Sequence, residues 1–541
     1  MFLRAQTYQP NIRGVKPANL FPSRADVTGH HRRFFSLSYP NGGEGRGEEA
    51  YYFQAQIPSP QPSPRSGGER ETGAVSGCTP ADKNWRGLLA LPALKSLAES
   101  LAALCEPDPA ECLSPALAER LFGPTLRSSV SRLEEFAACP FRFFVHSGLR
   151  AEERKVFELD AREQGSFQHE VLKIFHEQLS AEARRWRDLT PAEARDRAGK
   201  IAIELAPGYR NGLLRADGQS RFTARVLAES LQDFVETLVA WMRGQYEFDP
   251  AVAELEFGIG DGGAPAWEIN LGAGHKLALR GRIDRIDLCR EPGGRAWCVV
   301  MDYKSGRKKL DKILVGHGVQ LQLLVYLAAI RSWPPEVWAE LNLPAFFSLS
   351  PPGRGEGEES KISSVLKIAP AGVFYVNLRG QYERGQTRDE ALADADGARK
   401  RAYRHTGRFD AAALPQLDRV RAADQFNYRL NKDGGLRSDS MEALPRAEFE
   451  KLLDRVEAQL QEMGRAIFSG AMPVDPYRKG RETPCEYCDY RAACRIDPWT
   501  HQYRVLRAVK EEADLAAGVH LDTVLDSLSP PKRGEGWGEG I

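Results

Sequence analysis

Several features that would assign this 541-residue chain to a common class of protein are missing. No uncharged apolar run reaches the roughly 18 residues of a membrane span, so we expect no membrane partner. The chain has 74 Lys and Arg residues and 74 Asp and Glu residues. This balance excludes a generally basic surface but not a local basic groove. Nine cysteines are too few for a disulfide scaffold. The first residues show no signal-peptide pattern, so we expect a cytoplasmic protein.

Four segments rich in Pro, Gly, Ser and charged residues resemble one another, and they begin near Phe34, Ser59, Phe346 and Ser527. Such compositions bury too little apolar surface to offset the entropy cost of ordering, so we interpret them as mobile insertions or tails. The expected organisation is a largely disordered segment at 1–84, a short helical lead-in at 85–125, a folded domain at 126–505 with a low-complexity insert at 348–362, and a C-terminal helix and disordered tail at 506–541.

The spacing of apolar residues in the folded part alternates between a helical period and a strand period. The expected helices are 128–148, 162–179, 221–243, 320–330 and 449–467, and the expected strands are 276–288, 296–304 and a segment from Gly372 onward. The pattern therefore predicts an α/β fold.

Two carboxylates and a lysine are expected to meet on neighbouring strands. Asp302 and Lys304 are two residues apart in VVMDYKSG, so both side chains project from one face of that strand. A hairpin turn at 291–294 brings Asp284 within about one residue of facing Asp302. Carboxylates so close are unfavourable without a cation between them, and Mg²⁺ prefers carboxylate oxygens. The alternative is two solvated ion pairs, Asp284 with Arg282 and Asp302 with Lys304.

Three further residues extend this group along the sequence. His169 lies in a helix in QGSFQHEVL, and Gln322 and Tyr326 lie at i and i+4 on one face of a later helix. Each of them alone is more often a packing residue than a chemical one. Their joint order, His, Asp, Asp-x-Lys and Gln-x-x-x-Tyr, resembles the RecB-like branch of the PD-(D/E)XK nuclease superfamily.

This resemblance implies a restriction-endonuclease-like core, in which helices flank a mixed central sheet. It implies metal ligands at His169, Asp284 and Asp302, and candidate catalytic residues at Lys304, Asp302, Asp284, Gln322, Tyr326 and Glu254. The acidic residue before Asp284 is either Glu254 or Glu256, and the spacing favours Glu254. In such a site Mg²⁺ or Mn²⁺ acidifies a water molecule and neutralises the scissile phosphate, while Lys304 stabilises the developing charge.

A second group of residues is a set of cysteines. Cys485, Cys488 and Cys494 form a C-x2-C-x5-C pattern, which is compact enough for one metal ion or cluster but leaves a fourth ligand to be supplied. The candidate is Cys139, which lies 345 intervening residues upstream at a Cys-Pro step after an amphipathic helix. The spacing alone leaves zinc, an iron–sulfur cluster and unrelated buried thiols open.

The sequence around these cysteines narrows the resemblance. SVSRLEEFAACPFRFFVHSGLRAEER, GSFQHEVL and PYRKGRETPCEYCDYRAACRID resemble the nuclease region of AddB-type subunits of AddAB helicase–nucleases. The resemblance implies a 4Fe–4S cluster on Cys139, Cys485, Cys488 and Cys494 that joins both ends of the domain. It also implies a DNA exonuclease that works with an AddA-type helicase in double-strand-break repair. The chain itself has no GxxxxGK(S/T) motif, so we expect no ATP hydrolysis from it.

Two other functions compete with this one. CRISPR-associated RecB-like nucleases share the same residues and split cysteines but are usually shorter, and the helical stretches around Arg221 and Arg401 count against them. A non-catalytic DNA-binding fragment is the other alternative. The intact set of His169, Asp284 and Lys304, together with Asp302, counts against a loss of activity.

Overall fold

The computed structural model describes residues 112–508, apart from gaps at 153–156, 261–262, 292–294, 342, 345–346, 348–366, 381–386, 388, 390–393, 438 and 497–502. These residues all belong to one compact unit, Trp85–Ile541. The predicted segments at 1–84 and 348–362, most of the helical lead-in and the tail beyond residue 508 lie outside the described residues. No helix among the described residues is long and apolar enough to cross a membrane.

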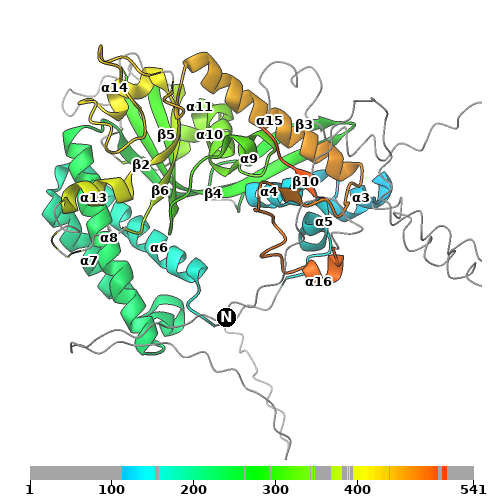
Figure 1. Cartoon of the computed structure of the whole chain (residues 1–541), viewed down its shortest axis with the longest axis horizontal. Helices are drawn as coiled ribbons and strands as arrows, with labels where there is room; N and C mark the ends of the chain where they lie inside the picture. The colour runs from blue at the N-terminus through cyan, green and yellow to red at the C-terminus, as the bar shows by residue number, and fades with distance from the viewer. Residues whose placement is uncertain are drawn as a thin grey trace, which may run out of the picture. The chain divides into compact units, whose positions relative to one another are not determined.

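A mixed sheet of eight strands forms the centre of the described domain (Figure 1). Its longest strand, β4 (His275–Arg290), pairs through its first half with β1 (Thr125–Ser129) in parallel and with β3 (Trp267–Gly272) in antiparallel. The second half of β4 pairs in antiparallel with β2 (Asp249–Phe257) and with β5 (Arg295–Lys304). β4 therefore connects the two parts of the sheet.

The sheet continues beyond β5 with both strand directions. β6 (Lys367–Asn377) runs parallel to β5, β7 (Thr406–Asp410) runs antiparallel to β6, and the short β8 (Ala443–Leu444) runs parallel to β7. Parallel and antiparallel pairs in one helix-flanked sheet confirm the predicted α/β class with a mixed central sheet.

Helices cover both faces of the sheet. One apolar core packs α4 (Val130–Ala138), α10 (Gln322–Ser332), α11 (Pro335–Glu340) and α15 (Arg446–Phe468) against one face. Cys298 and Val300 of β5 belong to this core.

A second apolar core packs α6 (Ala161–Ala181), α7 (Pro191–Leu205) and α8 (Gly218–Gly244) against the opposite face. The alternate β5 residues, Met301 and Tyr303 among them, belong to this core, as the period of a strand requires. Because both of its faces are covered, β5 is buried along nearly its whole length.

The remaining elements are short. They are α3 (Pro115–Phe122), α5 (Pro140–Phe143), α9 (Lys312–Gly316), α13 (Ala395–Tyr403), α14 (Leu414–Leu417), α16 (Arg491–Cys494), β9 (Tyr477–Arg478) and β10 (Arg504–Val505), with helical turns at Phe144–Gly148, Trp186–Asp188, Tyr209–Arg215 and Ala411–Ala413.

Two of the differences between the predicted and observed helix limits have a clear physical cause. The helix expected at 128–148 is interrupted because Cys139 is extended, with φ −165° and ψ 112°, and Pro140 begins a new helix at the position where proline is tolerated. The helix expected at 320–330 begins at Gln322 instead. The buried side chain of Gln320 bonds to the backbone of Lys309 and Asp311 in the loop after β5.

Candidate metal and nuclease site

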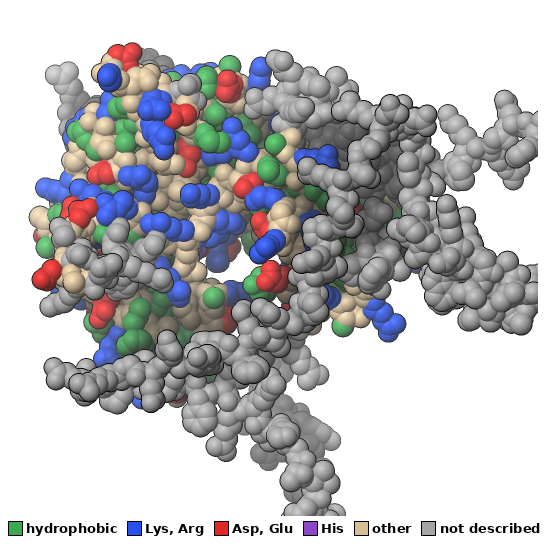
Figure 2. Space-filling view, in the orientation of Figure 1, with side chains coloured by type: hydrophobic (Ala, Val, Ile, Leu, Met, Phe, Trp, Pro, Cys, Tyr) green, Lys and Arg blue, Asp and Glu red, His purple; other side chains and the backbone are tan. Residues whose placement is uncertain are grey.

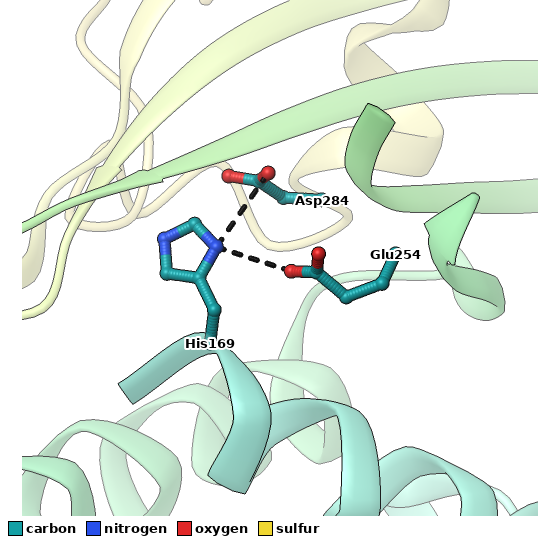
Figure 3. Close-up of side chains that lie close together, drawn as sticks. All are labelled: His169, Glu254 and Asp284. Carbon is teal, nitrogen blue, oxygen red and sulfur yellow. Dashed lines mark hydrogen bonds and ion pairs between the residues drawn. The ribbon is translucent and has the colours of Figure 1, made fainter. Parts of the chain in front are cut away.

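Three side chains from three elements meet at one side of the sheet. Nδ1 of His169, in α6, lies 3.1 Å from Oε1 of Glu254, in β2, and 3.6 Å from Oδ1 of Asp284, in β4 (Figure 3). One ligand atom from each residue lies within 4.8 Å of the other two, a spacing that one metal ion can bridge. The sequence predicted His169, Asp284 and Asp302 as metal ligands. The structure brings the first two together with Glu254, and Asp302 is not part of this group of three.

The backbone at Glu254 explains how its side chain reaches this group. Glu254 has φ +53°, in the left-handed region that non-glycine residues seldom adopt. Its neighbours Ala253 and Leu255 pair with Arg285 and Ile283 of β4. The left-handed turn between these two pairs directs the Glu254 carboxylate toward His169, where it is 7% exposed. Glu256 is exposed instead, so of the two acidic candidates it is Glu254 that lies in the group.

The hydrogen bond of His169 to the backbone leaves Nδ1 as the nitrogen that can bind a metal ion. Nε2 of His169 lies 3.3 Å from the carbonyl oxygen of Tyr303, and an Nε2–H can donate to that oxygen. Without an ion, Nδ1 can carry a proton and donate to Oε1 of Glu254. A bound ion would take the place of that proton between the ring and the two carboxylates. Histidine ligands commonly donate their second ring N–H to a backbone carbonyl in this way. The donor set therefore fits a divalent metal ion.

Asp302 and Lys304 lie beside this group. In the antiparallel pair of β4 and β5, Arg285 lies opposite Met301. Asp284 and Asp302 are therefore next to each other, as predicted from the hairpin. The Tyr303 backbone N–H donates to Oδ2 of Asp284 at 2.8 Å, so one residue of β5 binds both Asp284 and His169. Lys304 forms an ion pair with Oδ2 of Asp302. Asp302 is 1% exposed, whereas the Lys304 side chain is 28% exposed and can meet a substrate.

The pKa values show how concentrated the negative charge is. Burial and the neighbouring Asp302 charge raise the pKa of Asp284 to about 7, against the opposing effect of His169. Burial lowers the pKa of His169, but the hydrogen bond to Glu254 and the charges of Asp284 and Asp302 outweigh burial, so the net shift is upward. A bound cation would act against both shifts, because it favours the ionised carboxylate and the neutral imidazole.

Gln322 and Tyr326 contact each other on α10, as their spacing predicted. Nε2–H of Gln322 donates to Oη of Tyr326 at 3.3 Å, and the Tyr326 ring packs edge-on against Phe257 of β2. Burial, followed by the charges of Asp302 and Asp284, raises the pKa of Tyr326, which indicates that its hydroxyl lies near these carboxylates.

A buried ion pair behind the site was not predicted from the sequence. Nε and Nη2 of Arg285 each donate to an Asp287 carboxylate oxygen at 2.6 Å, and Oη of Tyr246 donates to the same carboxylate at 2.8 Å. Nη1 of Arg285 also lies 3.4 Å from Oη of Tyr303, whose backbone binds Asp284 and His169. The signal was present in RIDRID, where charged residues lie among apolar ones.

The four predicted cysteines line one small pocket. Cys139, between α4 and α5, is buried there, whereas Cys485, Cys488 and Cys494 are half-buried. None of the described cysteines forms a disulfide. Burial raises the pKa of Cys139 to about 11, so its thiol needs a cation in order to lose its proton near neutral pH.

Comparisons with known proteins agree with this architecture. A family model described as the PD-(D/E)XK nuclease superfamily matches residues 127–495. The chain belongs to the PD-(D/E)XK nuclease superfamily. The mixed sheet with helices on both faces is thus that of a member of this superfamily, whose nucleases use divalent metal ions. His169, Glu254 and Asp284 form a possible site for such an ion.

Individual relatives have a more specific name. Proteins named as the AddB subunit of an ATP-dependent helicase/deoxyribonuclease match at 35% identity over 71% of this chain in Moorella thermoacetica, at 32% over 73% in Symbiobacterium thermophilum and at 30% over 73% in Alkaliphilus metalliredigens. The matched stretch covers 31–32% of those relatives, so the chain spans about a third of their length. These matches confirm the predicted resemblance to AddB-type subunits.

Proposed function

We propose that this chain is a metal-dependent DNA exonuclease of the AddB type that hydrolyses phosphodiester bonds during double-strand-break repair, together with an AddA-type helicase. The proposal depends on one observation: His169, Glu254 and Asp284 lie close together beside the Asp302–Lys304 ion pair. The names of the relatives, which include both helicase and deoxyribonuclease, support the reaction and the partner.

Each residue has a distinct part in the proposed chemistry. His169, Glu254 and Asp284 hold the ion, with Asp302 as a neighbouring carboxylate. Bound Mg²⁺ or Mn²⁺ lowers the pKa of a water molecule and neutralises charge on the phosphate. Asp302 holds the ammonium group of Lys304 at the edge of the site, where it stabilises negative charge developing on the phosphate oxygens.

The surface is compatible with a nucleic-acid substrate. Lys and Arg side chains are spread across the middle of the face seen in Figure 2, with acidic side chains interspersed. Contacts to the DNA backbone need such local positive charge, even where the net charge of the whole chain is zero.

We further propose a 4Fe–4S cluster in the cysteine pocket. Four thiols on one pocket supply the required ligands. Zinc can also bind four thiolates in a tetrahedral site. The similarity to AddB-type subunits is the reason to propose a cluster here.

The function is tested with purified protein on end-labelled linear DNA. We expect degradation with Mg²⁺ or Mn²⁺, none with a chelator, and none for Asp302→Asn prepared in parallel, which controls for contaminating nucleases. Cleavage that persists in Asp302→Asn, or that proceeds without divalent metal, would refute the proposal. Association with an AddA-type helicase is tested by co-purification of the two proteins.

A further inference from the structure

Outside the group of His169, Glu254 and Asp284, which we call the metal-binding group, another carboxylate holds the start of helix α10. Oε1 of Glu134, in the middle of α4, accepts hydrogen bonds from the backbone N–H groups of Leu321 at 2.6 Å and Gln322 at 2.8 Å. These bonds join residues 187 and 188 positions apart in the sequence. Glu134 therefore connects two helices that the sequence gives no reason to associate.

The start of α10 needs such a partner. The first N–H groups of a helix have no acceptor within the helix, and a Ser, Thr, Asp or Asn side chain usually supplies one. The five residues before the helix, HGVQL, include none of these. Leu321 occupies the N-cap position, and its apolar side chain cannot accept a hydrogen bond. Glu134 supplies the missing acceptor from α4. Its negative charge also lies at the positive end of the helix dipole.

Glu134 lies close to the catalytic lysine as well. Burial raises the pKa of Glu134, while the two backbone hydrogen bonds and the charges of Lys308 and Lys304 act in the opposite direction. The carboxylate thus contacts the start of α10 and is near enough to Lys308 and Lys304 for their charges to act on it. A displacement of Glu134 would change both the position of Gln322 and the electrostatic field at Lys304.

The same helix leads to the cysteine pocket. α4 ends at Ala138, and Cys139 follows directly as the residue that caps α4 and contributes to the pocket. We propose that Glu134 is a positioning residue of the nuclease site, and that α4 couples the occupancy of the cysteine pocket to the placement of Gln322 and Tyr326. The expected effect on kcat rests on the proposed function, whereas the expected effect on amide exchange does not.

The structural part is tested by hydrogen–deuterium exchange at Leu321 and Gln322, which needs neither DNA nor activity. In Glu134→Met, which keeps the length of the side chain but loses the acceptor, exchange at these amides should be about tenfold faster. Glu134→Gln retains an acceptor oxygen and should restore most of the protection. Glu135→Gln removes a carboxylate from the next position of α4, where it binds His146 instead, and should leave the exchange at α10 unchanged.

The catalytic part is tested by steady-state cleavage of linear DNA. Glu134→Met should lower kcat by roughly tenfold or more with little change in KM for DNA, because it displaces groups near the reacting phosphate and not the DNA-binding surface. Glu134→Gln should recover most of kcat. Cys139→Ser should also raise exchange at Leu321 and Gln322, because it releases the end of α4.

Four results would overturn the inference. They are wild-type exchange in Glu134→Met, unchanged kcat in Glu134→Met when the wild type is active, an equal effect in Glu135→Gln, and failure of both Glu134 variants to fold, which would assign Glu134 to the fold as a whole. Wild-type exchange at α10 in Cys139→Ser would overturn the coupling to the cysteine pocket. An inactive wild type with the expected exchange pattern would refute the proposed function and leave the position of Glu134 supported.

Discussion

The metal-binding group and the cysteine pocket are built in different ways. His169, Glu254 and Asp284 lie on a long helix and two strands. The Tyr303 carbonyl oxygen accepts from His169, and the Tyr303 N–H donates to Asp284. Three of the four cysteines lie after β9, in a loop and the four-residue helix α16. The fold places the residues of the first group without an ion, whereas the second would depend more on the cluster that we propose for the cysteines. Loss of metal should therefore cost activity at the first site and stability at the second.

The cysteine segment has a second attachment that does not involve sulfur. β9 and β10, on either side of the segment, pair in parallel. Nε of Arg504 binds Oδ2 of Asp475 at 2.9 Å, and Nη2 of the same arginine donates to the carbonyl oxygen of Ala137 near the end of α4. The loss of the cysteine ligands should thus loosen the loop between β9 and β10 first.

The largest effect is expected for Cys139→Ala. A link between Cys139 and the late cysteines closes a loop of more than 300 residues, and the chain-entropy model assigns such a link roughly 5 kcal/mol. The variant should lose iron and its visible absorbance, unfold at a lower denaturant concentration and become protease-sensitive at both ends of the domain. Cys112→Ala, a half-buried cysteine that does not line the pocket, is the control. A Cys139→Ala protein that keeps its metal and its stability would contradict the proposed stabilising role of the cysteine pocket.

Lys304→Ala should show the opposite behaviour. Cleavage should fall by about a thousandfold, which corresponds to about 4 kcal/mol, because the lysine acts on charge that develops only in the transition state. The melting temperature and DNA affinity should stay close to those of the wild type. Lys173→Ala, on the exposed side of α6, removes an ammonium group that pairs with Glu177 and controls for the charge change. Undiminished cleavage by Lys304→Ala would exclude the lysine from catalysis.

Much of the fold was accessible from local sequence patterns. The alternation in 276–288 and the buried run in 296–304 predicted β4 and β5, because strand side chains repeat with a period of two and a doubly covered strand is apolar throughout. The single helix expected at 128–148 was wrong, although the Cys-Pro step signals the break at Cys139. The pairing of β4 with four different strands was not predictable from the sequence pattern, because it depends on contacts between distant segments.

The site was predictable to a similar extent. The two-residue spacing of Asp302 and Lys304 and the four-residue spacing of Gln322 and Tyr326 follow from strand and helix geometry, so the contacts within each pair were foreseen. The role of Glu134 was not, because it depends on a contact over 187 residues. The left-handed backbone at Glu254 was equally invisible, since a glutamate gives no signal for a positive φ.

Two histidines on α6 have opposite pKa shifts because their surroundings differ. His169 faces carboxylates and its pKa rises, whereas burial lowers the pKa of His176 to about 4. His176 accepts a hydrogen bond from Nε1–H of Trp186 at 3.3 Å, as a neutral ring can. Because its folded pKa lies below its unfolded value, its contribution to stability is complete above about pH 6.5 and is lost progressively as the pH falls toward 4.

The loss should approach about 3 kcal/mol, since each pKa unit corresponds to about 1.4 kcal/mol. Urea unfolding between about pH 7 and pH 4.5 should therefore show a steeper decline in the wild type than in His176→Gln, which has no titrating ring at that position. Equal pH dependence in the two proteins would show that His176 is not the group that titrates, and that acid acts on other residues in this range.

The smallest effect is expected for a matched pair of substitutions on β2. Glu254→Gln and Glu256→Gln each replace one carboxylate by an amide of the same length, two residues apart on one strand, but only Glu254 lies beside His169. Because glutamine keeps the Cβ, the strain at φ +53° is unchanged, and a difference between the variants reports charge at the site. Titration with Mn²⁺ should show affinity reduced on the order of tenfold or more in Glu254→Gln and unchanged in Glu256→Gln. Equal affinities would mean that the fold does not use Glu254 as a ligand and that the ion is held on the Asp302 side of Asp284.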